Sequence, residues 1–192
     1  MKPRPPTNPQ NLDELMLMAE DYAEFALRNN RQTPPTLIAA TKRGPLYFTP
    51  SSLEDERAKD DFGNTARLIC IAYEVAAAVF VLESWMKTAG EGETLDMNER
   101  PSEAMDRQEV VMLMGEAIGV QRTRILKIVR TDAGGFFGLT ELEGLPVDKF
   151  QGRFVQLMPT KTPPVSLAHV AKAMLTVKGL NEQKLRGGSK RG

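Results

Sequence analysis

The sequence predicts an α+β domain with an antiparallel sheet of about five or six strands and a main helix packed on one face, in the order α-β-β-α-β-β-β-β-α. Three observations support this fold class: an amphipathic helix with a capping motif, a continuously apolar strand directly after it, and short apolar runs separated by turn residues. Strands that are joined by short turns favour antiparallel pairing, and the helix needs a sheet on which to bury its apolar face.

The main helix is expected between residues 51 and 74. Ser51 and Ser52 each stand three residues before an acid, a spacing that is typical of a capping box at a helix N-terminus. Acids in the first turn also suit the positive end of the helix dipole. Apolar side chains then recur at spacings of four, three and four residues, which places them on one face of the helix: Phe62, Ala66, Ile69 and Tyr73.

A strand is expected at residues 79–85, directly after this helix. Its first four residues, Val79 to Leu82, are all apolar, which is typical of a strand that is covered on both faces or lies in the middle of a sheet. The run is much shorter than the roughly 20 apolar residues of a membrane-spanning helix. We therefore expect it to be the central strand.

Turn residues and apolar periodicity locate the remaining elements. Thr41 to Pro45 separates two short apolar runs and predicts a β-hairpin, and Pro45 favours an edge position for one arm. Residues 88–108 are rich in acids and predict a long surface loop, and residues 136–149 are expected to be irregular. The other predicted elements are a helix at 12–29 capped by Asn11, hairpin arms at 36–40 and 46–49, strands at 109–115, 121–131 and 153–158, and a helix at 167–177 capped by Ser166.

One domain of ordinary size is expected, at residues 11–178. The proline-rich residues 1–10 predict a disordered N-terminal arm, and residues 179–192 predict a basic flexible tail. The broad apolar stripe of the first helix indicates packing against the domain. The alternative is a partner-binding helix, because methionine-containing faces adapt to partners.

Charge and cysteine content argue against some classes of protein. The 192 residues carry 25 basic and 25 acidic side chains, so no overall field attracts nucleic acid or an acidic partner. The single cysteine, Cys70, cannot form an internal disulfide, and we expect it to be a small buried residue in a reducing cytoplasm. The residues after Met1 lack the apolar segment of a signal peptide.

The sequence contains no motif for a cofactor or a resident metal. His169 is the only histidine, which excludes histidine clusters and paired-histidine hydrolase signatures, and we expect a structural or surface role for it. The glycine pairs at 134–135 and 187–188 match neither G-x-G-x-x-G nor the P-loop pattern. We therefore expect no cofactor.

Acids near the 88–108 loop are the candidates for catalysis. Glu83 ends the predicted central strand and Glu109 begins the next strand, so both can border the same edge of the sheet, with Asp106 close in sequence. Carboxylates of this kind can hold a divalent cation or act as acid and base. The alternative is a set of solvated acids on a surface loop, which is favoured because no lysine follows at the spacing of a carboxylate-based nuclease.

Basic residues of the 121–131 strand and of the tail are candidate phosphate contacts. Such contacts bind nucleic acid in a salt-dependent way that is independent of its sequence. Aromatic residues suited to stacking on bases are absent from both stretches, which favours a solvated sheet face instead. The candidates are Arg122, Arg124, Lys127 and Arg130 on the strand, and Lys184, Arg186, Lys190 and Arg191 in the tail.

Two short motifs resemble a known group of sequences. The first is Glu83-Ser84-Trp85, and the second runs from Pro101-Ser102-Glu103 through Asp106-Arg107-Gln108-Glu109-Val110-Val111-Met112. A strand ending in E-S/A-W, followed by P-S-E-x-x-x-R-x-E-V, is similar to a group of uncharacterised bacterial and phage-borne proteins over residues 79–114. The resemblance implies a bacterial or mobile-element origin and the pairing of the two strands. It implies no activity and no catalytic residue.

These observations favour a non-catalytic domain that binds a macromolecule, such as a protein partner, or associates with itself through an exposed sheet edge or the first helix. Two alternatives stay open. One is a metal-dependent hydrolase or nuclease that uses Glu83, Asp106 and Glu109, and the other is a weak nucleic-acid binder that uses the basic strand and tail. We expect a cytoplasmic protein without membrane contact.

Overall fold

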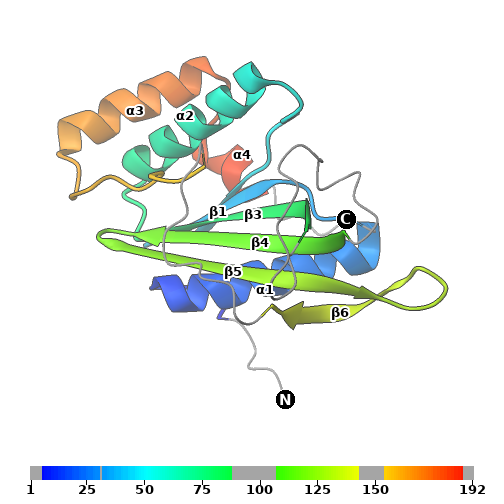
Figure 1. The fold of residues 1–192 in the computed structure, drawn as a ribbon. Helices are drawn as coiled ribbons and strands as arrows, with labels where there is room; N and C mark the ends of the chain where they lie inside the picture. The colour runs from blue at the N-terminus through cyan, green and yellow to red at the C-terminus, as the bar shows by residue number, and fades with distance from the viewer. Residues whose placement is uncertain (1–5, 31, 88–106, 143–153, 188–192) are drawn as a thin grey trace.

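The computed structural model describes residues 6–30, 32–87, 107–142 and 154–187, which form a six-stranded sheet with helices on both faces (Figure 1). The predicted fold class and order of elements are confirmed. The strands are β1 (Thr36–Thr41), β2 (Gly44–Phe48), β3 (Ala77–Met86), β4 (Gln108–Ala117), β5 (Val120–Arg130) and β6 (Phe136–Glu141). The helices are α1 (Leu12–Asn30), α2 (Glu56–Ala72), α3 (Val165–Val177) and α4 (Glu182–Gly187).

The sheet has the order β2-β1-β3-β4-β5-β6, and all neighbouring strands are antiparallel. β3 lies inside the sheet between β1 and β4, and its residues 77–81 are buried. The predicted central strand is therefore confirmed, as are the hairpins on both sides of it. β2, which contains Pro45, is the edge strand that a proline without an N–H favours.

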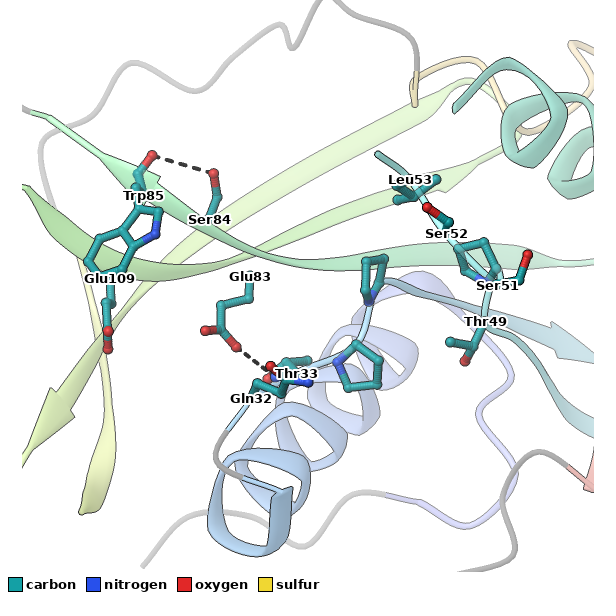
Figure 2. Close-up of a pocket in the computed structure, with 13 residues that line it drawn as sticks. Gln32, Thr33, Thr49, Ser51, Ser52, Leu53, Glu83, Ser84, Trp85 and Glu109 are labelled. Carbon is teal, nitrogen blue, oxygen red and sulfur yellow. Dashed lines mark hydrogen bonds between the residues drawn. The ribbon is translucent and has the colours of Figure 1, made fainter. Parts of the chain in front are cut away.

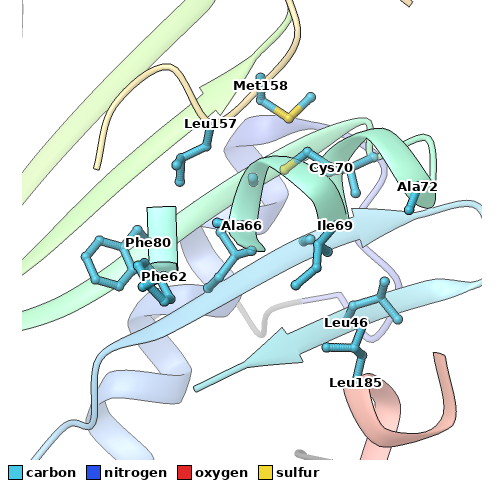
Figure 3. Close-up of a cluster of buried hydrophobic side chains, with 14 of the residues drawn as sticks. Leu46, Phe62, Ala66, Ile69, Cys70, Ala72, Phe80, Leu157, Met158 and Leu185 are labelled. Atoms are coloured by element: carbon cyan, nitrogen blue, oxygen red, sulfur yellow. The ribbon is translucent and has the colours of Figure 1, made fainter. Parts of the chain in front are cut away.

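Successive residues of β3 enter two separate hydrophobic cores, because side chains alternate between the two faces of a strand. Val79 and Val81 pack in the core below α1. Ala78 and Phe80 pack in the other core, below α2 and α3 (Figure 3). This alternation between two covered faces explains the continuously apolar run. The sequence predicts that the main helix, α2, packs on one face of the sheet. In the structure, α1 covers the opposite face.

α2 begins at Glu56, and its cap differs from the predicted one. Asp55 Oδ1 accepts a hydrogen bond from the backbone N–H of Ala58 at 2.6 Å. The hydroxyl of Ser52 accepts from the N–H of Glu54, which lies before the helix. The predicted serine cap is therefore wrong, because an ionised carboxylate at the N-cap makes a stronger hydrogen bond than a hydroxyl. The predicted apolar face is confirmed, since Phe62, Ala66 and Ile69 are buried.

α1 packs its apolar stripe on β3 and β4 and is capped as predicted. Asn11 Oδ1 accepts from the N–H of Glu14 at 2.9 Å. The helix lies so close to β4 that a Cβ atom at Gly115 would stand 2.7 Å from Met16 Sδ and 2.9 Å from Leu12 Cδ1. Most of the stripe is buried against the sheet, which favours the packing interpretation of this helix over the partner-binding one.

Residues 136–141 form β6, although the sequence predicts irregular structure there. A tight turn precedes them: Thr131 donates its backbone N–H to the carbonyl oxygen of Gly135 at 2.8 Å. Gly134 has a φ of +79°, a conformation that glycine adopts without steric cost. The turn directs the chain back along β5 and so creates a sixth strand at the edge of the sheet.

Residues 154–158 form no strand, although a strand is predicted at 153–158. The backbone N–H groups of Gln156 and Met158 donate to the carboxylate of Glu116, at 2.6 and 3.0 Å, instead of to a neighbouring strand. Gln156 also has a φ of +58°, which interrupts an extended chain. A buried side chain on β4 therefore takes the place of a strand partner.

The C-terminal segment is ordered further than predicted. Residues 182–187 form α4 instead of the expected flexible tail, because Leu185 is buried in the core below α2 and α3. α4 packs against the edge strand β2. The predicted Ser166 cap of α3 is also wrong. The N-cap residue is Pro164, and its carbonyl oxygen accepts hydrogen bonds from the N–H groups of Leu167 and Ala168.

Several predictions concern residues outside the described ranges. These are most of the 88–108 loop, the first half of the N-terminal arm, Asp106, Lys190 and Arg191. Within the ranges that the structure describes, no helix is both long enough and apolar enough to cross a membrane.

Candidate functional site

A hollow of about 420 Å³ lies at the end of the sheet where β3 finishes and β4 begins (Figure 2). The loop between α1 and β1 and the loop between β2 and α2 line its other sides. We call it the carboxylate hollow, because two of the predicted catalytic candidates line it. It is defined by Thr33, Thr49, Ser51, Glu83, Trp85 and Glu109.

Glu83 is half-buried in this hollow and has a perturbed acidity. Its carboxylate accepts a hydrogen bond from the backbone N–H of Thr33 at 2.6 Å. Burial raises the pKa of Glu83 above its ordinary value; the Thr33 N–H opposes the rise, the charge of Glu109 adds to it, and Arg130 opposes it. A glutamate with a raised pKa is a better proton donor near neutral pH than an exposed one.

Glu109 has its charge compensated by an arginine. It lies opposite Trp85 in the pairing of β3 with β4, and its carboxylate forms an ion pair with Nε of Arg130 at 2.5 Å. The guanidinium of Arg107 lies 4.5 Å from the centre of the Trp85 ring, a cation–π contact. Both guanidinium groups therefore hold side chains at the rim of the hollow.

The described part of this site does not amount to a metal centre. Among the residues that the structure describes, no group of three or more His, Cys, Asp or Glu side chains is placed to hold a metal ion. Glu83 and Glu109 share the carboxylate hollow, whereas Asp106 lies outside the described residues. What the described groups can do is bind a proton at Glu83 and accept hydrogen bonds.

The candidate phosphate contacts of β5 do not form one basic surface. Lys127 is exposed and lies on the opposite face of the strand from Arg124, three residues earlier, because side chains alternate along a strand. The other three side chains are already paired with acids: Arg122 with Asp13, Arg124 with Glu20 and Glu141, and Arg130 with Glu109. These ion pairs reduce the positive potential that a phosphate would meet.

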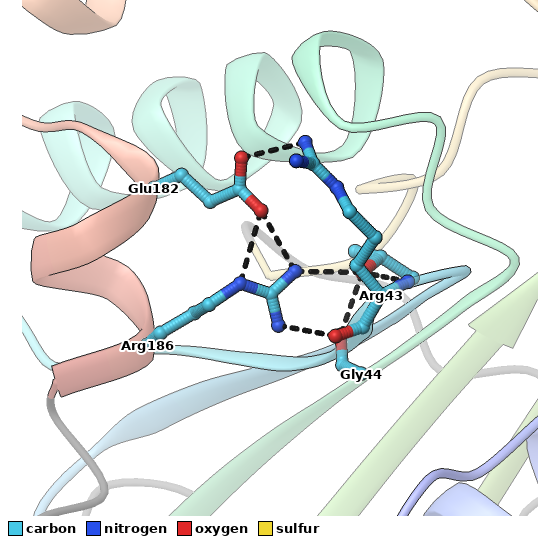
Figure 4. A network of polar contacts seen from close by, with 5 residues as sticks. Arg43, Gly44, Glu182 and Arg186 are labelled. Carbon is cyan, nitrogen blue, oxygen red and sulfur yellow. Dashed lines mark hydrogen bonds and ion pairs between the residues drawn. The ribbon is translucent and has the colours of Figure 1, made fainter.

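A second hollow, of about 320 Å³, lies at the other end of β1 and β2. Glu182 on α4 accepts a hydrogen bond from Arg43 at 2.7 Å and one from Nε of Arg186 at 2.9 Å (Figure 4). Arg186 also donates to the carbonyl oxygen of Arg43 at 2.7 Å. These bonds fix α4 to the β1–β2 turn, so the network is a structural junction.

The outer side of α3 carries a row of exposed apolar side chains, which we call the α3 stripe. A second apolar row on the same helix is buried, on the side that packs against α2. The buried row consists of Ala168, Ala171 and Leu175. The α3 stripe consists of Leu167, Val170, Met174 and Val177, which are 44%, 55%, 50% and 90% exposed.

The sequence predicts this helix, whereas the exposure of its apolar stripe was not predicted. The signal is present in the sequence, because apolar residues recur at spacings of three, four and three residues beside the row that faces α2. Two adjacent rows make an apolar surface that is wider than the roughly 100° stripe of a helix with one buried side. The number of neighbours that a helix has in the fold, however, cannot be counted in the sequence.

The histidine and the cysteine lie away from the carboxylate hollow. His169 is exposed on α3, in agreement with the expected surface position. Cys70 is buried as predicted, and burial raises the pKa of its thiol to about 12. A thiol with such a pKa is almost entirely protonated at neutral pH and is therefore a poor nucleophile.

No family model, curated protein or solved structure matches this chain.

Proposed function

We propose that this chain is a non-catalytic domain that binds another polypeptide through the α3 stripe. The observation that carries the proposal is the exposure of four large apolar side chains in one continuous row on an outer helix. Exposed apolar rows of this kind mark interaction surfaces when the side chains are contiguous and not scattered.

The physical reason lies in the composition of α3. A wide apolar surface on a helix is normally covered over its whole width, and among the described elements α2 covers only one of the two rows. Removing apolar surface from water yields about 25 cal/mol per Å². A row with spacings of three, four and three residues fits the groove of a partner helix, because such residues lie along one seam.

The test compares two neighbouring substitutions that add the same charge. Val170→Glu places a carboxylate in the α3 stripe, whereas His169→Glu places one on the exposed side next to it. Both variants should keep the melting temperature of the wild type within about 2 °C, because exposed positions contribute little to stability. Wild type and His169→Glu should bind the partner, and Val170→Glu should lose at least about tenfold in affinity.

The partner is sought by immobilising the three proteins in extract of the source cells. A protein that the wild type and His169→Glu retain, and that Val170→Glu does not, is identified and its affinity measured again in purified form. If no polypeptide, including the chain itself, distinguishes Val170→Glu from His169→Glu, the proposed function is wrong.

A metal-dependent hydrolase is the second candidate, and one observation favours it: Glu83 and Glu109 line the same hollow, and the pKa of Glu83 is raised. A bound divalent cation stabilises the folded state by mass action. In a hydrolase of this kind, Mg²⁺ or Mn²⁺ raises the melting temperature of the wild type and of Asp132→Asn, an exposed acid in a turn, but not of Glu109→Gln. A wild type that neither cation shifts would rule this candidate out.

Nucleic-acid binding has less support, because three of the four strand candidates carry acidic partners. A cytoplasmic location agrees with the single cysteine, which has no internal disulfide partner. The bacterial or mobile-element origin rests on the two short motifs described above.

A further inference from the structure

We propose that the partner of the α3 stripe is a second copy of this chain, with the two α3 helices packed antiparallel about a two-fold axis. This inference rests on the proposed function, because it names the occupant of the same surface. A two-fold interface uses the same patch on both copies, so the patch must be complementary to itself. The α3 stripe meets this requirement in shape and in charge.

The shape argument comes from the order of the side chains. In an antiparallel pair that is centred on residue 172, Leu167 lies opposite Val177 of the second copy, and Val170 lies opposite Met174. Each long side chain therefore faces a short β-branched one, and the two-fold axis repeats both contacts. Large side chains packed against small ones fill the space between two helices without voids.

The flank of the stripe that lies away from α2 permits close approach of a second helix. Ser166 and Ala173 border the stripe, since successive residues of a helix are about 100° apart. Both side chains are small and lack a charge. Two helices whose contact residues are small or short can approach to interaxial distances of about 8–10 Å.

The charges of α3 lie outside this surface. Lys172 lies on the opposite side of the helix and contacts the ring of Tyr73 on α2's C-terminal end, 5.7 Å from the ring centre. Lys178, which follows the helix, is ion-paired with Asp61 of α2. Two copies therefore meet without like charges at the contact, and antiparallel helix dipoles attract each other.

The size of the surface sets the strength of the association. A 13-residue helix is about 20 Å long, so a single helix pair buries less than the roughly 1,600 Å² of a standard stable interface. We therefore expect a reversible dimer with a dissociation constant on the order of 1–100 μM. Because the contact is apolar, added salt should not weaken it.

The first experiment measures molecular mass by sedimentation over a concentration series of the purified full chain. Wild type and His169→Glu should pass from monomer to dimer in the micromolar range, at low and at high salt. Val170→Glu should remain a monomer, because each copy would bury a carboxylate against Met174 of the other. A dimer that persists in Val170→Glu would overturn the inference.

The second experiment locates the two-fold axis. Ala173→Cys places a thiol beside the axis, and the thiol should be linked to its symmetry mate by a short bis-maleimide. Cys70 does not compete, because it is buried and its pKa is raised. Lys172→Cys, on the opposite side of the helix, is the matched control and should remain unlinked. Equal yields from the two variants would overturn the antiparallel arrangement.

The outcomes separate this inference from the proposed function. A wild type that stays monomeric at the highest concentration, while another protein binds the α3 stripe, overturns the inference and leaves the proposed function intact. A monomeric wild type for which no partner distinguishes Val170→Glu from His169→Glu overturns both.

Discussion

At the scale of single residues, two glutamates on neighbouring strands bind backbone groups of irregular segments. Glu83 accepts the N–H of Thr33, and Glu116 accepts the N–H groups of Gln156 and Met158. Buried N–H groups need an acceptor, and a carboxylate supplies a strong one. Glu83 therefore has a structural use in addition to its position in the carboxylate hollow.

The raised pKa of Glu83 predicts a pH-dependent effect of Glu83→Gln. The folded chain holds this proton more tightly than the unfolded chain, so stability falls as the pH rises from near the ordinary value of 4.5 through the raised pKa. Glutamine keeps an oxygen acceptor for Thr33 but has no proton to lose. The melting temperature of Glu83→Gln minus that of the wild type should therefore be more positive at pH 7 than at pH 4.

The measurement is thermal unfolding of both proteins across this pH range. Asp132→Asn, at an exposed turn position, is the control and should show a smaller pH-dependent difference. A difference for Glu83→Gln that is constant or declines toward pH 7 would contradict the raised pKa.

At the scale of elements, the contact between α1 and β4 depends on one glycine. A Cβ atom at Gly115 would stand within 3.0 Å of the ends of two α1 side chains that are themselves buried. Gly138 on β6 is also a strand glycine, but its Cβ position has no neighbour within 4 Å. Packing therefore requires a glycine at position 115 but not at position 138.

Valine at these two glycines should have opposite effects. Gly115→Val should lower the free energy of unfolding by about 1–3 kcal/mol, because it overpacks the contact with Leu12 and Met16. Gly138→Val should leave stability unchanged or raise it slightly, since valine favours a strand more than glycine does. Urea denaturation of both variants checks the prediction. If both variants were equally destabilised, the loss of stability would come from replacing any strand glycine and not from the contact between α1 and β4.

At the scale of the whole molecule, the C-terminal helix covers one edge of the sheet. α4 packs against β2, and Leu185 enters the core below α2 and α3. An edge strand with free N–H and C=O groups can pair with another chain. α4 therefore hinders the pairing of another chain with β2, whereas β6 forms the other edge of the sheet.

Leu185→Ala tests whether α4 belongs to the folded unit. It should lower the free energy of unfolding by about 2–4 kcal/mol, because a fully buried leucine is lost from the core. Gln183→Ala, an exposed position on the same helix, should change stability by less than about 0.5 kcal/mol. Chemical denaturation measures both. A Leu185→Ala variant as stable as Gln183→Ala would mean that the segment is as loosely held as a flexible tail.

Local patterns in the sequence were sufficient for the class of fold, the central strand, both hairpins beside it and most of α1, α2 and α3, because apolar periodicity and turn residues act over a few positions. They were also sufficient to bring Glu83 and Glu109 to one edge of the sheet. They were not sufficient for the segment at 154–158 or for α4, because the partners of these segments are distant in sequence: Glu116 for the first, and the core around Leu185 for the second. β6 was also missed, although its partner β5 directly precedes it along the chain.

The α3 stripe also depends on both the local sequence and the tertiary structure. Its spacing can be read in the sequence, but an apolar residue is informative about function only when it is exposed. Whether a second row of a helix is covered depends on how many layers the fold stacks around it. In this chain α2 covers one row of α3 and leaves the other in contact with water, and that outcome was decided only by the packing of two elements that are distant in sequence.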